Sequence, residues 1–225
     1  MDYIFLSNTI LFRGASPEEV RAMLDCLGAE KRKYQRGEVV YHAGDSISLM
    51  GLVLSGSVSI ENDDVWGNKS ILDKVGPGQV FAESYACVPG EPLMVSVVAA
   101  DTAEILFLDI SRVLHICSNT CVFHSKLIGN LLFISSQKNL NLSRRIFHTS
   151  SKSIRGRLLS YLSFQATQHG SCDFEIPFNR QQLADYLSVD RSAMSNELSK
   201  MQRDGLLSVK RNHFILAGIN PDNRL

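Results

Sequence analysis

The chain has 225 residues, of which 44% are hydrophobic and 20% charged, and its formal net charge is zero. This balance is ordinary for a soluble globular protein with a core of normal size, and it does not indicate a disordered chain. No apolar run approaches the roughly 18 residues that a membrane-spanning helix needs. The N-terminus also lacks the basic start and cleavage site of a secretion signal. We therefore expect a cytoplasmic protein with no membrane partner.

The cysteines are odd in number and scattered, which predicts reduced thiols rather than a disulfide framework. Cys117 and Cys121 are four residues apart and would share one helix face. Buried small side chains are the favoured interpretation of this pair, and a thiol sensor or metal pair stays open. The five cysteines are Cys26, Cys87, Cys117, Cys121 and Cys172.

The first expected element is a short helix over residues 16–28. Ser16 is a good N-cap, and the proline and two acids after it suit a first turn. Apolar side chains then repeat at helical spacing. They are Val20, Met23, Leu24 and Leu27.

Residues 37–110 are predicted to form strands. Glycines divide this region into short runs rich in Val, Ile and Leu, and runs spaced about 8–12 residues apart indicate an all-β sandwich or barrel. The segment 57–60, Ser-Val-Ser-Ile, alternates polar and apolar side chains as a half-buried strand does. The expected runs are 38–42, 50–61, 69–75, 93–100 and 103–109.

Residues 111–147 lose the regular glycine punctuation and gain apolar side chains at helical spacing, which predicts one long helix. One small domain cannot cover a helix of this length. It either packs on its own β-domain or forms a dimer seam, and the dimer is favoured. The apolar positions are Val113, Leu114, Cys117, Val122, Leu127, Leu131, Ile134, Leu140 and Leu142.

A polar break at residues 148–151 is the predicted domain boundary, and a further helix is expected over 152–168. That helix carries Ile154, Leu158, Leu159, Leu162 and Phe164 and stops at Gly170. The expected division is a β-domain at 1–110, a central helix at 111–147 and a C-terminal domain at 148–225.

The segment 178–198 has the pattern of a helix-turn-helix. Asn179 is a good N-cap, and Gln182 can complete a capping box, so a short helix begins here. A tight turn at 188–190 follows, and Asp190 caps a second helix, which the small Ala184 allows to approach closely. The side chains expected to point inward are Leu183, Ala184, Leu187, Val189, Ala193, Met194, Leu198 and Met201.

The second helix leaves hydrogen-bonding side chains facing out, Ser199 and Lys200 among them. In such motifs its N-terminal end enters the major groove of DNA, where Arg pairs with guanine and Asn with adenine. The predicted base-reading residues are Arg191, Ser192, Ser195 and Asn196.

Two short strands after Gly205 make a wing with a basic turn at 210–212, which suits phosphate contacts. From residue 148 on, ten Lys and Arg outnumber seven Asp and Glu. A surplus this small supports nucleic acid only alongside such a motif. The residues predicted to contact DNA phosphates are Asn179, Arg180, Gln181, Lys200, Lys210 and Arg211.

A β-roll, a long helix and a winged helix in this order resemble the Crp/Fnr family of bacterial transcription regulators over nearly the whole chain. Arg180-Gln181, Leu183-Ala184, Arg191 and Gly205-Leu206-Leu207 stand where the family's motif has its equivalents. The resemblance implies an α+β fold with a cyclic-nucleotide-binding-like jelly roll and no enzymatic activity. It also implies a homodimer on inverted-repeat promoter sites in double-stranded DNA, in contact with RNA polymerase.

Two departures from the family matter. Many members carry Arg where this chain has Asn196, so the preferred half-site should change. In the family's nucleotide cassette, Phe-Gly-Glu-Leu precedes Arg-Ser or Arg-Thr, whereas here Ala82 replaces the glycine and Leu93 the arginine. Burying a phosphate without a paired cation is costly, so we expect no cyclic AMP or cyclic GMP binding. An effector pocket for a more apolar ligand is still expected, or one filled by its own side chains. Its residues would be Glu83, Ser84, Leu93 and Met94.

Other cofactors are not expected. Iron–sulfur members of the family gather three cysteines near the N-terminus, where this chain has only Cys26, so we predict no cluster. His42, His115 and His124 are predicted to be structural or surface residues rather than haem ligands. A cupin-like metal enzyme would need a His-x-His pair, which the chain lacks, so no metal or catalytic residue is predicted. A regulator controlled by thiol oxidation, or by no ligand, stays the alternative.

Overall fold

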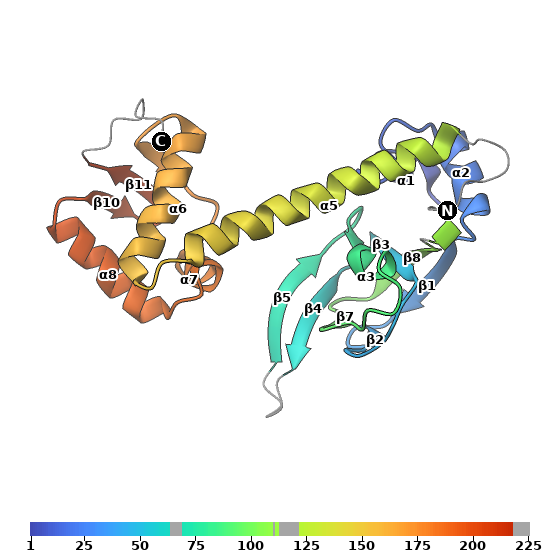
Figure 1. Ribbon diagram of the computed structural model, residues 1–225, viewed down its shortest axis with the longest axis horizontal. Coiled ribbons are helices and arrows are strands. Elements are labelled where there is room, and N and C mark those ends of the chain that lie inside the picture. The colour runs from blue at the N-terminus through green and yellow to red at the C-terminus, as the bar shows by residue number, and fades with distance from the viewer. Residues whose placement is uncertain (64–68, 110, 113–121, 218–225) are drawn as a thin grey trace. The chain divides into compact units, whose positions relative to one another are not determined.

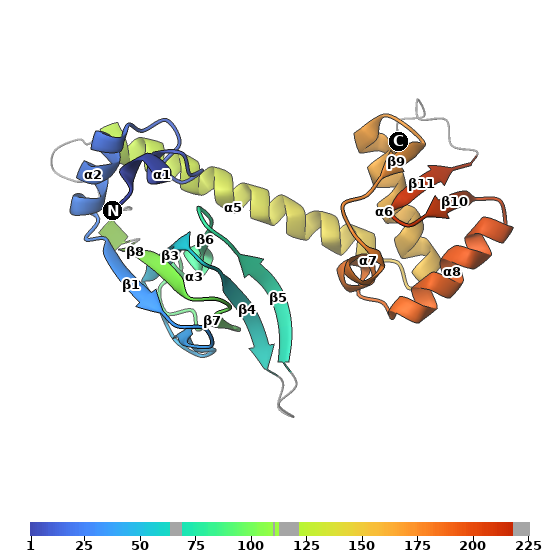
Figure 2. The same ribbon diagram turned by 180° about the vertical axis from the view of Figure 1, so that it is seen from behind.

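The computed structural model describes residues 1–63, 69–109, 111–112 and 122–217. Two compact units divide the chain, Met1–Gln137 and Lys138–Leu225 (Figures 1 and 2). No helix among the described residues is long and apolar enough to cross a membrane. The expectations for Val113, Leu114, His115, Cys117 and Cys121 lie outside these residues, as do those for the side chains of Val122 and His124.

The first unit contains two four-stranded antiparallel sheets. One has the order β1 (Glu30–Tyr34), β8 (Ala103–Asp109), β3 (Leu49–Ser55) and β6 (Val80–Phe81). The other has the order β2 (Val39–Tyr41), β7 (Ser96–Ala99), β4 (Val58–Asp63) and β5 (Lys69–Val75). The β-roll predicted for this part of the chain is confirmed.

Three details of the strand prediction were wrong. The run 50–61 is two strands, because the chain turns at Gly56, which has a φ of +73° and lies against the Thr102 carbonyl. The alternation at 57–60 predicts a half-buried strand, yet Ser57 and Ser59 on its polar side are also buried. The run 93–100 shortens to β7, so Leu93 precedes the strand.

The space between the two sheets is filled by the protein's own aromatic rings. Tyr41 stacks edge-on against Phe81 and Phe107, with centroid distances of 6.3 and 5.9 Å. Its hydroxyl donates to the Leu49 carbonyl at 2.8 Å, and burial raises its pKa. A Cβ atom at Gly51 would collide with the Phe81 ring. The interior of the sandwich is therefore a packed core.

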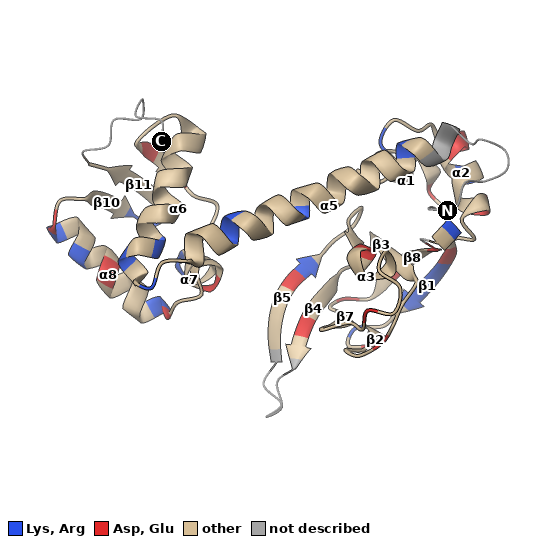
Figure 3. Cartoon of the chain, viewed as in Figure 1, with Lys and Arg blue, Asp and Glu red and all other residues tan. Residues whose placement is uncertain are grey.

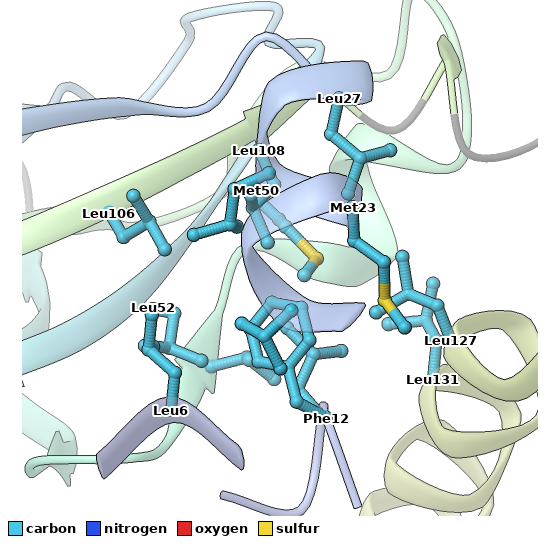
Figure 4. Close-up of a cluster of buried hydrophobic side chains, with 14 of the residues drawn as sticks. Leu6, Phe12, Met23, Leu27, Met50, Leu52, Leu106, Leu108, Leu127 and Leu131 are labelled. Carbon is cyan, nitrogen blue, oxygen red and sulfur yellow. The ribbon is translucent and has the colours of Figure 1, made fainter. Parts of the chain in front are cut away.

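Helices cover the outer face of the first sheet: α1 (Tyr3–Ser7), α2 (Pro17–Cys26), α3 (Glu83–Ala86) and the first part of α5 (Val122–Thr149). Figure 4 shows Leu127 and Leu131 of α5 beside Met23 of α2. The predicted N-cap Ser16 starts α2, and the structure adds a capping box that Glu19 completes. The four apolar side chains predicted to repeat along this helix are all buried.

Polar contacts fix the first half of α5 against the N-terminal segment. The Asn130 amide donates to the Leu11 and Arg13 carbonyls at 3.0 and 2.9 Å. The Lys126 ammonium donates to the Gly14 carbonyl at 2.9 Å and lies 3.1 Å from Glu19. One face of α5 therefore belongs to the first unit.

The second unit contains the end of α5, α6 (Ile154–His169), β9 (Asp173–Glu175), α7 (Arg180–Leu187), α8 (Arg191–Arg203), β10 (Leu207–Lys210) and β11 (His213–Leu216). The strands form one antiparallel sheet in the order β10-β11-β9. Its core joins α6, both helices of the turn motif and the sheet. The helix predicted over 152–168 is α6, although Leu159 on it is 37% exposed.

We expect Ala82→Gly to stabilise the first unit by about 0.5–1 kcal/mol. Ala82 has a φ of 60°, in the left-handed region, which costs a side-chain-bearing residue about 1–2 kcal/mol. Part of the gain is offset because glycine has more freedom in the unfolded chain. Urea denaturation would measure the change. Ala100→Gly, at a position without positive φ, is the control and should destabilise.

Candidate DNA-binding surface

Local capping sets both helices of the turn motif. The Asn179 side chain accepts from the backbone N–H of Gln182 at 3.0 Å, and the Gln182 side chain accepts from the backbone N–H of Asn179 at 2.9 Å. The predicted capping box therefore starts α7. Asp190 caps α8 by accepting from the Ala193 amide at 2.7 Å. Between them Ser188 takes a left-handed conformation with φ of 54°. Two inward predictions need correction, because Val189 and Ala193 are only partly buried, while the remaining six are fully buried.

The outward face of α8 places three of the four predicted base-reading side chains in solvent. Arg191, Ser192 and Asn196 are exposed and make no side-chain bond within the described part of the chain. Ser195 differs, because it is partly buried and its hydroxyl donates to the Arg191 carbonyl at 2.9 Å. Ser195 can therefore accept a hydrogen bond from a base without leaving the helix, but not donate one.

Some of the residues predicted to contact phosphates already bond to acids of the same chain, and others do not. The Gln181 amide donates to Asp185 at 2.8 Å, and Lys200 lies 3.8 Å from Glu197. Lys210 and Arg211 are exposed and pair with no acid in the described residues. These two cations are therefore the most available to DNA.

A hollow between the start of α7 and the wing brings two arginines together. Its lining includes Asn179, Arg180, Gln182, Arg211 and Asn212. The Arg180 guanidinium lies 5.4 Å from the centroid of the Phe214 ring, and burial lowers its pKa, although an arginine stays charged at neutral pH.

The wing turn is shorter than predicted. Lys210 pairs with His213, so Arg211 and Asn212 alone make the turn. Arg211 has a φ of 57°, and the Asn212 amide donates to the Ile176 carbonyl at 3.2 Å. Basic residues also mark α8 (Figure 3). Within the described part of the chain Arg180 and Arg211 form no ion pair, although Glu175 lines the neighbouring hollow together with Arg211. Two unpaired cations in one hollow suit an anion such as a phosphate.

Two arginines that the sequence prediction missed hold the end of α7. Arg145 donates to the Asp185 and Tyr186 carbonyls at 3.1 and 3.2 Å. Arg157 donates to the Leu187 and Ser188 carbonyls at 3.0 and 2.9 Å. Cations are favourable at a helix C-terminus, where carbonyls lack partners. These contacts fix the turn that aims α8.

A third arginine fixes α8 itself. Arg155 on α6 lies 2.6 Å from Glu197 and 2.8 Å from Asp204, and these acids raise its pKa. The pairing also offsets the negative charge of Glu197, which directly follows Asn196. Without it, this carboxylate would repel DNA phosphates near the reading face.

An aromatic cluster buries His148 at the end of α5. Its Nδ1 lies 2.9 Å from the Tyr186 hydroxyl, and the rings of Tyr161 and Phe164 lie 5.5 and 5.1 Å away. Only 1% of this histidine is exposed. Burial, and secondarily the nearby Arg144, lower the pKa of His148. The native protein therefore holds this histidine neutral.

Stability of the second unit is expected to fall as the pH drops below about 6.5. The unfolded chain binds a proton at His148 near that pH, whereas the folded chain does so only at lower pH. The unfolding free energy should then decrease by up to about 1.4 kcal/mol per pH unit until the folded pKa is reached. Thermal unfolding across pH 5–8 tests this. His148→Phe should flatten that slope, and His169→Gln, at an exposed histidine, should keep it.

Comparison with known proteins agrees with this architecture. Two family models match the chain: the cyclic nucleotide-binding domain over residues 31–120 and the Crp-like helix-turn-helix domain over residues 156–218. The cyclic AMP receptor protein of Thermus thermophilus is 34% identical over 98 residues, which are 44% of each protein. Electron transport regulator A of Shewanella oneidensis is 24% identical over 204 residues, covering 86% of this chain and 77% of the relative. A solved structure of CprK complexed with OCPA has a TM-score of 0.61 at 15% identity, covering 88% of this chain and 89% of that one.

A β-roll followed by a long helix and a winged helix with an exposed reading face defines a DNA-binding transcription regulator. The chain belongs to the Crp/Fnr family of these regulators. The predicted family and fold class are therefore confirmed. Its domains and relatives are those of regulators, which are not enzymes, as predicted.

Proposed function

We propose that the protein binds inverted-repeat promoter sites as a homodimer, with α5 of one copy packed against α5 of another. The exposed apolar face of α5 is the observation that carries this proposal. Leu132, Leu142 and Ile146 are 66%, 61% and 69% exposed. Monomeric proteins seldom leave this many large apolar side chains along one helix face in water.

The row has the spacing of a coiled coil. Ile128, Leu132, Leu142 and Ile146 occupy a and d positions of one heptad register along α5. Phe133, Leu140 and Phe147 form a second row at intervals of seven, and all three are exposed. An adjacent face, with Leu127 and Leu131, is already buried in the first unit. The exposed face therefore suits a second copy of the chain.

A two-fold dimer would present two copies of α8 to two half-sites of one operator, about one helical turn of DNA apart. Arg191, Ser192 and Asn196 would read base edges, and Ser195 would serve as an acceptor. Arg180, Lys210 and Arg211 would contact phosphates on either side. Such a regulator would act in the cytoplasm and contact RNA polymerase at the promoter.

The β-roll would respond to a signal other than cyclic AMP or cyclic GMP. Leu93, at the position of the phosphate-binding arginine, is 3% exposed and contributes no charge. Of the expected pocket residues, Glu83 is also buried, whereas Ser84 is exposed and Met94 is 75% exposed. A small, largely apolar effector near Glu83 fits these side chains better than a phosphate does.

Thiol control is less favoured at one of the cysteines. Cys87 is partly buried, and burial, with a smaller effect of Glu83, raises the pKa of its thiol. The thiolate, which is the reactive form, is therefore scarce at neutral pH. Cys26 is exposed and is the better candidate if oxidation regulates the protein.

Selection of bound duplexes from a random DNA pool tests the proposal. We expect enrichment of a two-fold symmetric sequence, with one base position in each half-site losing its preference in Arg191→Ala. Enrichment of a single asymmetric half-site, or of no sequence, would contradict it. Mass spectrometry of small molecules carried through purification then addresses the effector, and added cyclic AMP should leave DNA affinity unchanged.

A further inference from the structure

The exposed apolar face of α5 is interrupted at its centre. In the heptad register of Ile128, Leu132, Leu142 and Ile146, the intervening core positions are 135 and 139, which are Ser and Asn. Asn139 is exposed and forms no side-chain hydrogen bond within the described part of the chain. By contrast Asn141, two residues further on, accepts from Arg144 at 3.2 Å. The seam therefore has an apolar stretch at each end and an amide between them.

Charge pairs cannot set how two α5 helices align. From Val122 to Thr149 the helix contains two lysines and two arginines but no Asp or Glu. Coiled coils usually select partner and register with opposite charges beside the seam. α5 has no such pairs of opposite charge, so the alignment of two α5 helices must come from the residues at the seam itself.

An asparagine amide is suited to this because it carries both donors and an acceptor. Two identical copies facing each other across a two-fold axis can satisfy one another. A slip of one heptad, about 10 Å along the helix, would place Asn139 against Leu132 or Ile146 of the other copy. The amide would then be buried without a partner, which is unfavourable.

We propose that Asn139 fixes the register of the homodimer by pairing with the same residue of a second copy, with Ser135 extending this polar layer. The inference rests on the proposed homodimer. A single polar core position is a known means of specifying register at some cost in stability. The consequence is one fixed alignment of the two chains, as a DNA site with a fixed half-site spacing requires.

Oxidative cross-linking of the 225-residue chain tests whether Asn139 of one copy lies beside Asn139 of the other. Asn139→Cys should form a disulfide between copies, identified by mass spectrometry as a peptide linked 139 to 139, so that native cysteines do not confuse the result. Asn141→Cys, off the seam, is the matched control and should not link. Linkage of Leu142→Cys without linkage of Asn139→Cys would overturn the inference while leaving the homodimer intact. If neither Asn139→Cys nor Leu142→Cys formed a cross-link and the wild-type protein were monomeric, the proposed homodimer itself would be wrong.

Asn139→Leu tests the function of the amide. We expect sedimentation to give a dimer dissociation constant at least tenfold lower than that of the wild-type protein. The dimer should nevertheless bind its selected operator at least tenfold more weakly, because several registers become available. Asn141→Leu should change neither quantity. A tighter dimer with unchanged operator affinity would show that Asn139 does not set the register.

Discussion

Replacing Leu132 and Ile146 together by glutamate is expected to separate the dimer and to lower affinity for the selected operator by more than a hundredfold. Both side chains are about two-thirds exposed in the single chain, at 66% and 69%, and would be buried in the seam. Four carboxylates without partners would then lose their hydration, at several kcal/mol each. A separated winged helix keeps one half-site and most of its phosphate contacts, so binding should fall toward its non-specific level.

Sedimentation equilibrium and fluorescence anisotropy would measure the two effects in one preparation. Gln137→Glu with Asn141→Glu is the matched control, because it adds the same charge to α5 at exposed positions off the apolar face. The control should remain a dimer with operator affinity lowered only slightly. A dimeric Leu132→Glu/Ile146→Glu protein with full affinity would rule out α5 as the interface.

Arg191→Ala should weaken binding to the selected operator by about 1–3 kcal/mol and relax preference at one base position. Arg191 is the first residue of α8, is exposed, and makes no ion pair within the described residues. Its guanidinium is therefore available for the two acceptors of a guanine edge. Competition binding against operators changed at single positions would measure the loss at each position.

Lys210→Ala provides the contrast, because a lysine on the wing contacts phosphate rather than base. It should weaken binding to all sequences alike and lower the slope of log affinity against log salt by about one. If both variants lost the same base preference, or neither did, the division between reading helix and wing would be wrong.

Local chemistry explains why the turn motif could be predicted in detail. The capping boxes at Ser16–Glu19 and Asn179–Gln182, and the cap at Asp190, are each completed within three residues along the chain. Their geometry depends little on the rest of the protein. Helix starts, the turn and the exposed end of α8 therefore follow from short stretches of sequence.

Contacts between distant segments explain most of what was missed. Strand β1 is fully charged over its first four residues and forms only because it pairs along the edge of the sheet with β8. Charged side chains on such an edge strand discourage pairing with another chain. Arg145 reaches carbonyls about 40 residues further along the chain, and no local pattern identifies that partner. The burial of Ser57 and Ser59 likewise depends on partners about 40 residues away, because their hydroxyls donate to Asp101 and to the Val98 carbonyl.

The mass of the protein–DNA complex tests the central claim most directly. Native mass spectrometry on a duplex carrying the selected inverted repeat should give two chains per duplex, and a duplex with one half-site destroyed should bind far more weakly. One chain bound at full affinity to the intact repeat would contradict the homodimer and its two-fold reading of DNA.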